Sequence, residues 1–526
     1  MSDRLSFKRN FKIRILAFAK TSDSAKTKVQ NIAGAFKQFN TTLLNGFTMG
    51  EVKIDDEEFL RKFRLRLLDG GEILNIEELA SLYHLPSQAV ETPNIVWTRA
   101  KKGEPPANLP VEGSVPKEDL TIFAETDFRN QRQRFGIKTD DRRRHIYTIG
   151  RTGTGKTTMI ENMAVDDILK GRGVAIVDPH GDFAERMLDM IPDNRVEDVV
   201  YFDPADREYP IGFNLLENVN PELKSIVASG LVGIFQKIWA FTWGPRLEYI
   251  LRNAILALLD YPGATLMGVL KILIDSKFRK EVMRYVKDPV IKEFWLKEFA
   301  SYNDRLRTEA VSPIQNKVGQ FVSSPTIRNI IGQQRSTIDI QKIMNEGKIL
   351  IINLSKGKIG EDNSALLGAM VITQIQLAAM NRVFSPESER KPFYLFVDEF
   401  QNFATRSFIK ILSEARKYKL NLTVANQYMA QLDREIQDAI LGNVGTLISF
   451  LVGAQDAQIL EREFGKEFTA DDLVSLSRFQ VLLKLCIDGE TSNPFYATTL
   501  PLPACVNQQR EKVIRVSRER FGRKVK

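Results

Sequence analysis

The sequence predicts an α/β protein with a mainly parallel β-sheet, an inserted all-α domain and a small α+β N-terminal domain. Short apolar runs alternate with helical patterns from about residue 119 onward, which is typical of strand–helix–strand units. Long helical periodicities without a convincing strand interrupt this alternation between residues 216 and 345. Before residue 98, one alternating segment is followed by two helical ones. The parallel sheet is therefore expected to be split in sequence and joined in space.

The local patterns place the individual elements. Residues 7–17 alternate and predict a strand, Ser22 or Ser24 is expected to cap a helix running towards Phe39, and Asn75 to cap a short helix over 76–83. The segment 98–118 is rich in proline and lacks periodicity, which predicts a linker. Strands of the core are expected at 145–149, 173–177, 198–202, 348–354, 393–397, 422–425 and 446–450.

These elements divide the chain into six expected parts. They are an α+β domain (1–97), a Pro-rich linker (98–118), a first part of the α/β core (119–215), an inserted all-α domain (216–345), a second part of the core (346–505) and a basic tail (506–526).

Composition narrows the class of protein. The chain has 526 residues, of which 43% are hydrophobic, enough for a large core. It has only two cysteines and no Cys/His cluster, so we expect a reducing, cytoplasmic setting and neither a disulfide scaffold nor a zinc site. No signal peptide is expected, and the uncharged segment 363–381 is expected to be a buried helix rather than a membrane span.

The charge is compatible with nucleic acid but does not establish it. The net charge is +8, and basic residues gather in the first twenty residues and in the last seventeen. For these termini, simple solvation remains an alternative of equal weight to a role at nucleic acid or at an anionic membrane.

A glycine-rich loop is the firmest motif. It follows an apolar strand and precedes a helix, and it has the spacing G-x-x-x-x-G-K-T of a phosphate-binding loop. Backbone N–H groups of such a loop wrap phosphates at a helix N-terminus, the lysine meets the β- and γ-phosphates, and the threonine hydroxyl reaches Mg²⁺. ATP and Mg²⁺ are the expected ligands, and the expected binding residues are Gly150, Arg151, Thr152, Gly153, Thr154, Gly155, Lys156, Thr157 and Thr158.

Two carboxylates end a later strand. Asp398 is expected to hold Mg²⁺ together with Thr157, and Glu399 to accept a proton from the attacking water. A dinucleotide-binding fold is the natural competitor, because Asp178 ends the second strand of the core, where a ribose-binding acid would lie. The loop spacing and the second acidic motif disfavour it.

Further candidates follow other strands. Gln427 ends the strand after Asp398 and is expected to sense the γ-phosphate or orient water if the two strands are central neighbours. Arg416 is a candidate arginine finger for a neighbouring subunit's nucleotide, although its spacing alone is equally that of a solvated helix residue. His180, Asp182 and Asp203 also follow strands; for His180 a turn-closing role is favoured over contact with nucleotide.

The motifs GRTGTGKTT, AIVDPHGD, FNLLE, WGPRLEYILRNAILALL, LFVDEFQNFAT and LSEARKYKLNLTVANQYMAQL together resemble the HerA/FtsK superfamily, most closely the coupling proteins of type IV secretion and conjugation. The resemblance covers about residues 120–500. It implies a RecA-like P-loop NTPase core with an inserted all-α domain, a ring of six subunits, and ATP hydrolysis that drives DNA through the pore. It also implies that Gln427 is the γ-phosphate sensor and Arg416 the trans-acting arginine.

The expected function is an ATP-driven, Mg²⁺-dependent DNA translocase, the coupling ATPase of conjugative or type IV secretion DNA transfer. Its expected partners are DNA, bound through the backbone without sequence preference, further copies of itself, and a relaxase or a separate membrane or secretion-channel protein. The expected location is the cytoplasm, including the inner face of the membrane. An ATPase for secretion-machine assembly or protein export, a soluble DNA-processing translocase and a nucleotide-binding scaffold without turnover remain alternatives.

Overall fold

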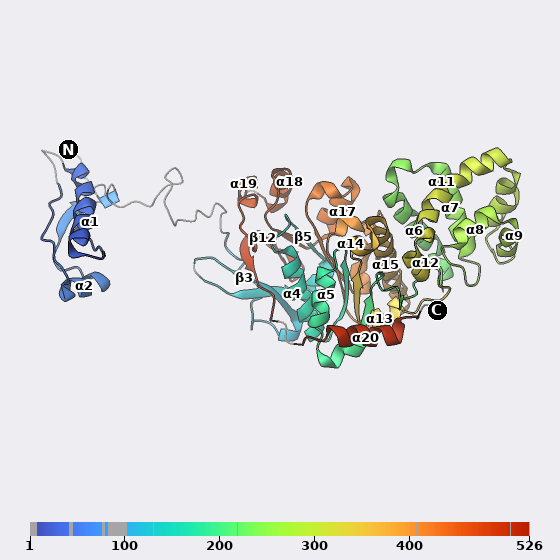
Figure 1. Cartoon of the computed structure of the whole chain (residues 1–526), viewed down its shortest axis with the longest axis horizontal. Coiled ribbons are helices and arrows are strands. Elements are labelled where there is room, and N and C mark those ends of the chain that lie inside the picture. Colours follow the sequence, from blue (N-terminus) through green and yellow to red (C-terminus); the bar gives the residue numbers. More distant parts are fainter. Residues whose placement is uncertain are drawn as a thin grey trace. The chain divides into compact units, whose positions relative to one another are not determined.

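The structure is a computed structural model that describes residues 8–40, 46–75, 79–80, 82, 103–129, 131–217, 219–406, 408–465, 467–504 and 507–524. The chain forms two compact units, residues 1–97 and 98–526 (Figure 1). Each unit is described by itself.

The N-terminal unit is a small α+β structure. Strand β1 (Lys8–Phe11) pairs antiparallel with β2 (Glu72–Asn75), and the chain between them forms α1 (Ser22–Ala35) and α2 (Glu57–Arg64). The strand predicted over 7–17 is wrong in length, because ladder pairing stops at residue 11. The cap of α1 is also corrected: the Thr21 hydroxyl, rather than a serine, accepts a hydrogen bond of 3.3 Å from the Ser24 N–H. Most of the helix expected over 76–83 lies outside the described residues.

An eleven-stranded sheet forms the centre of the second unit. Its strand order is β4-β3-β15-β12-β11-β5-β10-β9-β6-β8-β7, parallel from β11 to β7 and antiparallel from β11 to β4. The parallel strands are β5 (Ile146–Ile149), β6 (Gly173–Asp178), β7 (Val199–Phe202), β8 (Ile349–Asn353), β9 (Phe393–Val397), β10 (Leu420–Asn426) and β11 (Thr446–Ser449). The antiparallel ones, which the apolar runs did not predict, are β3 (Leu120–Thr126), β4 (Arg134–Lys138), β12 (Gln480–Lys484) and β15 (Phe495–Thr499). The mixed, mainly parallel α/β fold expected from the sequence is confirmed.

Helices cover both faces of this sheet. One face packs against α4 (Lys156–Leu169) and α5 (Asp182–Asp189), which share one hydrophobic core with it. The other face packs against α13 (Ile340–Glu346), α15 (Glu361–Asn381), α16 (Phe408–Glu414), α17 (Arg434–Asn443) and α18 (Ala454–Phe464). Among the described helices, α15 alone is long and apolar enough to cross a membrane, and most of it is buried in this core. Smaller elements are α14 (Lys356–Ile359), α19 (Ala470–Leu473) and the hairpin of β13 (Cys486–Ile487) and β14 (Glu490–Thr491).

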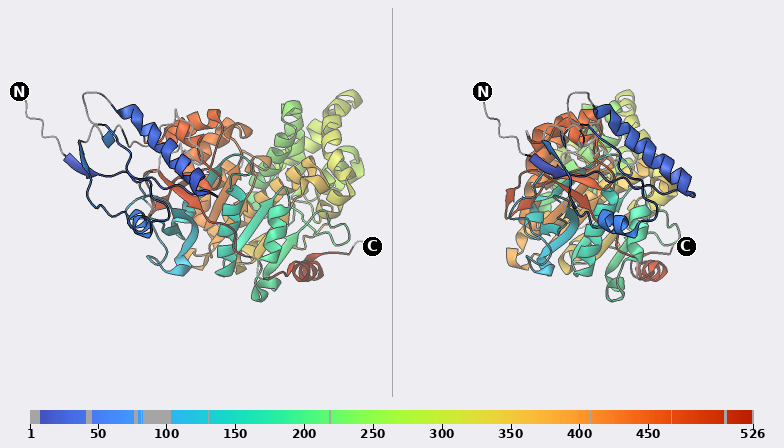
Figure 2. Two further views of the ribbon diagram at one scale, coloured as in Figure 1. Left: turned by 60° about the vertical axis from the view of Figure 1, so that its left-hand side comes forward. Right: turned by 90° about the vertical axis from the view of Figure 1, so that its left-hand side faces the viewer.

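The helical interruption is confirmed as an insertion. The described residues between β7 and β8 contain no named strand, and the helices before α13 stand beyond one end of the sheet (Figures 1 and 2). Its largest buried side chain is Trp295, packed against Phe294 and Phe299. The inserted helices are α6 (Lys224–Ile238), α7 (Pro245–Leu258), α8 (Gly268–Ile274), α9 (Ser276–Val282), α10 (Pro289–Glu293), α11 (Asp304–Ser323) and α12 (Pro325–Ile331).

Two terminal segments of this unit are more ordered than their composition indicates. In the second half of the proline-rich segment, Leu109 is buried and Val111 bridges to Phe135 of β4, so this half joins the sheet instead of linking domains. The basic tail contains helix α20 (Arg510–Phe521), which covers the edge strand β7. Val513 of this helix is buried, and the Ser517 hydroxyl accepts a 2.9 Å hydrogen bond from the Tyr201 N–H.

Candidate nucleotide site

The glycine loop connects β5 to α4 in the geometry that its sequence predicts. Gly153 and Gly155 have φ angles of 79° and 116°, a region that other residues rarely adopt. A side chain at Gly155 would also meet the ring of Phe479. Gly155 directly precedes the first helical residue, Lys156, so the N–H groups of the first turn of α4 face the loop. This arrangement suits a bound phosphate.

The loop lysine is buried and lies close to the two carboxylates. Its Nζ donates to the Gly150 carbonyl and, at 3.1 Å, to the Arg151 carbonyl. Burial lowers the pKa of Lys156 from its usual value, although the nearby charges of Asp398 and Glu399 act in the opposite direction. A phosphate bound in the loop would place a negative charge beside Lys156 and so favour its protonated form.

Thr157 and Asp398 meet across the sheet edge. Asp398 directly follows β9, and the Thr157 hydroxyl donates a 2.8 Å hydrogen bond to its Oδ2. Burial raises the pKa of Asp398, and a cation beside it would favour the ionised form. These two hard oxygen donors fit Mg²⁺, which proteins usually hold through one or two carboxylates and the substrate's phosphates. The described residues contain no group of three or more His, Cys, Asp or Glu that would hold a metal by themselves.

Glu399 is the centre of a polar cluster. Strand β10 lies between β5 and β9, so Gln427, the residue after β10, reaches it: the Gln427 amide donates a 2.6 Å hydrogen bond to Glu399 Oε1. The other carboxylate oxygen of Glu399, Oε2, lies 2.8 Å from His180 Nε2 and 3.4 Å from Lys356 Nζ. It also accepts a 3.2 Å hydrogen bond from the Asn402 amide. The strand order on which the Gln427 prediction depended is therefore confirmed.

The environment keeps Glu399 ionised. Burial by itself raises the pKa of Glu399, but the hydrogen bond and charge of His180, the charge of Lys356 and the hydrogen bond from Gln427 outweigh it, and the pKa is lowered. Its side chain is 12% exposed and its φ is 44°, in the left-handed region. This unusual backbone turns the carboxylate towards the ends of the neighbouring strands.

Sequence reasoning did not predict the contacts of His180 and Lys356 with Glu399. His180 follows β6 and Lys356 begins α14 after β8; the two loops are joined where the Lys356 N–H donates to the Pro179 carbonyl. The available signal was their position after two parallel strands, because the carboxyl ends of such strands share one sheet edge. Which strands are neighbours was not visible in the sequence.

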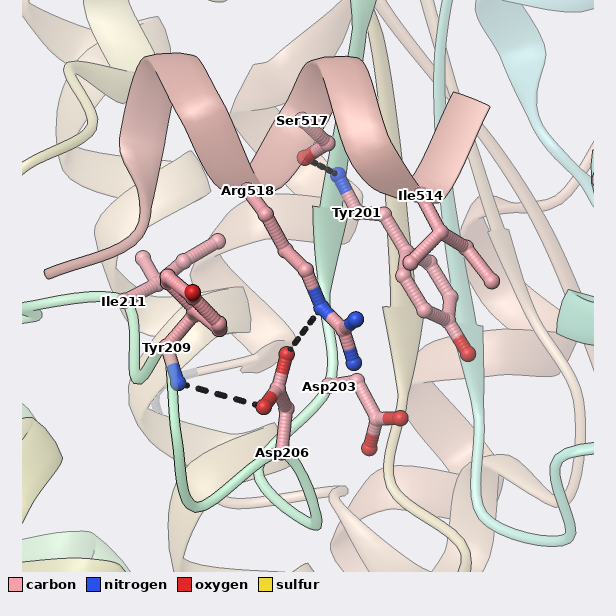
Figure 3. A pocket seen from close by; sticks show the side chains of 8 residues that line it. All are labelled: Tyr201, Asp203, Asp206, Tyr209, Ile211, Ile514, Ser517 and Arg518. Carbon is pink, nitrogen blue, oxygen red and sulfur yellow. Dashed lines mark hydrogen bonds and ion pairs between the residues drawn. The ribbon is translucent and has the colours of Figure 1, made fainter. Parts of the chain in front are cut away.

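The other strand-end acids do structural work. Asp178 uses both carboxylate oxygens to cap backbone, accepting from the N–H groups of His180 and Ala184 at 2.8 and 2.9 Å. Asp203 caps Ala205 and lines a pocket under α20. In that pocket Arg518 of α20 pairs with Asp206 at 2.6 Å, and Asp206 also accepts from the Tyr209 N–H (Figure 3). Asp182 lies in the first turn of α5. These contacts fix the ends of loops and helices. None of them is a contact with the polar cluster around Glu399.

Arg416 is not part of the cluster. It lies exposed in the 3₁₀ turn Ala415–Tyr418, which precedes the first residue of β10, whereas Gln427 follows the last. The seven residues of β10 separate Arg416 from Gln427, a distance of about 20 Å at the usual rise per residue. The two residues therefore lie at opposite ends of the parallel strands. Arg416 therefore cannot reach the nucleotide site of its own subunit.

Comparisons with known proteins agree with this geometry. A family described as the type IV secretion-system coupling protein DNA-binding domain matches residues 134–480, about two thirds of the chain. A second family, a domain of unknown function, matches residues 7–98. No curated protein sequence matches the chain.

Solved structures share the fold. A bacterial conjugative coupling protein, TrwBdeltaN70 in an unbound form, is similar with a TM-score of 0.52 at 14% identity, over 71% of this chain and 88% of that one. The plasmid coupling protein TrwB in complex with ADP and Mg²⁺ is similar with a TM-score of 0.53 at 14% identity, over 78% of this chain and 98% of the other. At these identities the likeness establishes the fold.

Proposed function

The chain belongs to the family of type IV secretion-system coupling proteins, and from this premise we propose that it is a Mg²⁺-dependent ATPase that moves DNA as a ring of six subunits. The contact that carries the proposal is the one between Glu399 and Gln427 at the sheet edge that also holds the glycine loop. It supports an enzyme that turns ATP over, because a carboxylate and an amide beside the phosphate loop are the groups that activate and orient water.

Each residue of the site then has one task. Lys156 and the N–H groups of the glycine loop bind the phosphates, and Thr157 and Asp398 hold the metal. Mg²⁺, when bound, neutralises phosphate charge. Glu399 takes a proton from water, and Gln427 orients that water or senses the γ-phosphate. Arg416 acts on the site of a neighbouring subunit, since its own site lies at the opposite edge of the sheet. The solved relative with ADP and Mg²⁺ supports the choice of ligands.

The proposed organisation assigns the motor core, the helical insertion and the N-terminal unit to different tasks. Residues 119–215 and 346–505 form the motor core, 216–345 the helical insertion, and 1–97 a separate unit that recruits a relaxase or a membrane or secretion-channel protein to a motor in the cytoplasm or at the inner face of the membrane. The basic N-terminal segment and the division of the chain at residue 97 support this assignment. Removing residues 1–97 should leave ATP hydrolysis intact and abolish DNA transfer in cells; loss of hydrolysis would contradict it.

DNA-stimulated hydrolysis tests the function directly. ATP turnover by the assembled full chain is measured with Mg²⁺ or EDTA, and with single-stranded, double-stranded or no DNA, with Lys156→Ala as the inactive control. We expect stimulation by DNA of any sequence and its loss at high salt, because backbone contacts are electrostatic. Unchanged hydrolysis with either DNA in an intact ring would contradict DNA translocation. Stimulation by a secretion protein instead would favour an export or assembly ATPase, and absence of turnover a scaffold.

A further inference from the structure

Lys237 connects the inserted helical domain to the segment that carries Glu399. It is the penultimate residue of α6, and its Nζ donates two hydrogen bonds of 2.6 Å, to the carbonyls of Gln401 and Ala404. Both carbonyls belong to the tight turn directly after Glu399, in which Asn402 contacts the Glu399 carboxylate. Lys237 is thus connected to the Glu399 carboxylate through this turn, by its own hydrogen bonds to the turn and by the hydrogen bond from Asn402, although the insertion is remote in sequence.

The same turn is also anchored to the core. Phe400 and Phe403 are buried; the Phe400 ring lies 4.3 Å from that of Phe408 of α16, and Phe403 packs against Gly368 of α15. Phe400 and Phe403 therefore fix the inner side of the turn. Lys237 reaches its main-chain oxygens from the insertion, so it is placed to pass a movement of α6 to the turn.

The end of α6 is also where an exposed loop of the insertion begins. Trp239 follows Lys237 by two residues and packs on Phe235 and on Phe321 of α11, with ring centroids 5.5 and 5.2 Å apart. Phe241, two residues further on, is fully exposed. A ligand that moves this loop or α11 would therefore act close to Lys237.

We propose that Lys237 is a positioning residue for ATP hydrolysis, which ties the insertion to the Glu399 turn so that movement of the insertion changes the position of Glu399. This inference rests on the proposed function, because it presumes that Glu399 acts on water. It goes beyond that function by naming the contact through which the helical domain would regulate the site.

The chemistry of the lysine supports this role. Burial lowers the pKa of Lys237 to about 8, and the charge of Asp433 acts in the opposite direction. Among the described residues, Asp433 is the charged group that acts on it. The ammonium form, which donates three hydrogen bonds and cannot accept any, suits two carbonyls. That form is lost as the pH rises through about 8. An arginine at this position keeps its charge throughout.

The test compares three variants of the full chain. Lys237→Met removes the donors and keeps the aliphatic stem, Lys237→Arg restores charged donors, and Lys224→Met is the matched control. Lys224 is also on α6 and partly buried, but pairs with Asp260 inside the insertion. The measurements are kcat and KM for ATP with and without DNA, their pH profiles, and hydrogen exchange of residues 399–405.

For Lys237→Met we expect kcat to fall about 10- to 100-fold with KM nearly unchanged, because a small displacement of a catalytic group costs this much. Exchange in 399–405 should become faster. In the wild type, kcat should fall as the pH rises through about 8. Lys237→Arg should have a kcat close to that of the wild type at lower pH, without this fall on the alkaline side of the pH–kcat profile. Lys224→Met should keep the wild-type kcat and exchange in 399–405.

Two results would overturn the inference. One is a kcat of Lys237→Met equal to that of Lys224→Met, even if exchange becomes faster, because the contact would then be structural only. The other is unchanged exchange in 399–405, which would remove the tie itself. If the wild type hydrolyses no ATP under any condition while exchange responds to Lys237→Met, the proposed function fails and the tie alone stands.

Discussion

The side-chain amide of Gln427 donates a 2.6 Å hydrogen bond to one carboxylate oxygen of Glu399, although the two residues end different strands. The contact exists because β10 and β9 are parallel neighbours, which brings both strand ends to one edge of the sheet. His180, Lys356 and Asn402 occupy the other oxygen. A carboxylate oxygen can accept two hydrogen bonds, so a water can donate to Glu399 Oε1 beside the Gln427 amide. The consequences of this arrangement can be measured.

Glu399→Gln should abolish turnover and preserve ATP binding. The amide keeps the size of the side chain but does not accept a proton, so we expect kcat to fall about 10²- to 10⁴-fold. Single-turnover hydrolysis and binding of a fluorescent ATP analogue separate the two effects. Glu511→Gln, on the exposed side of α20, is the control and should retain activity. Wild-type kcat in Glu399→Gln would show that another group is the base.

His180→Gln should move the acid limb of the pH–kcat profile to higher pH. Glu399 acts in its ionised form, so activity is lost as the pH falls through its pKa. His180 lowers that pKa, and its removal raises it. Lys356→Met should shift the limb in the same direction. Lys358→Met, on the same helix but paired with Glu185 at 3.2 Å, should not. A limb that stays in place in both His180 and Lys356 variants would contradict this account.

Arg416→Ala should lower kcat about 10³-fold or more, as expected for an arginine finger, with little change in ATP affinity. Lys417→Ala, its exposed neighbour in the same turn, is the control. Mixing Arg416→Ala with Lys156→Ala subunits should restore part of the activity, because an intact loop then meets an intact arginine across an interface. Mass photometry checks that mixed rings form. Mixed rings as inactive as their parents would exclude action between subunits.

Asp167→Asn should destabilise the core by about 3–5 kcal/mol, the usual effect of breaking a buried pair. Asp167 and Arg142 are 0% and 1% exposed and lie 2.7 Å apart, and Arg142 also stacks on Tyr394 of β9 at 4.0 Å. The free energy of unfolding from denaturant titration measures the loss. Glu293→Gln breaks the exposed pair with Lys297 and should change stability little. Similar losses in the two variants would contradict the role of burial.

The sequence by itself determined the phosphate loop, the apolar strands around it and the helical insertion. Each of these features depends on a contiguous stretch of sequence. The signals are the glycine spacing before Lys156, the apolar run Phe393–Val397 before Asp398, and the helical periodicity of the insertion. The antiparallel strands β3, β4, β12 and β15 were missed, and the N-terminal strand was predicted too long, because their pairing partners are distant and local alternation does not mark where a ladder stops.

Only the tertiary structure decided which side chains meet. The order β5-β10-β9-β6-β8 brings Gln427, His180 and Lys356 to Glu399, and it leaves Arg416 at the opposite edge. The packing of α6 brings Lys237 to a carbonyl 164 residues further along the chain. The physical reason is that neighbouring parallel strands place their carboxyl ends side by side, whatever their distance in sequence. The glycine loop could therefore be predicted from its own residues, whereas the groups that contact Glu399 could not.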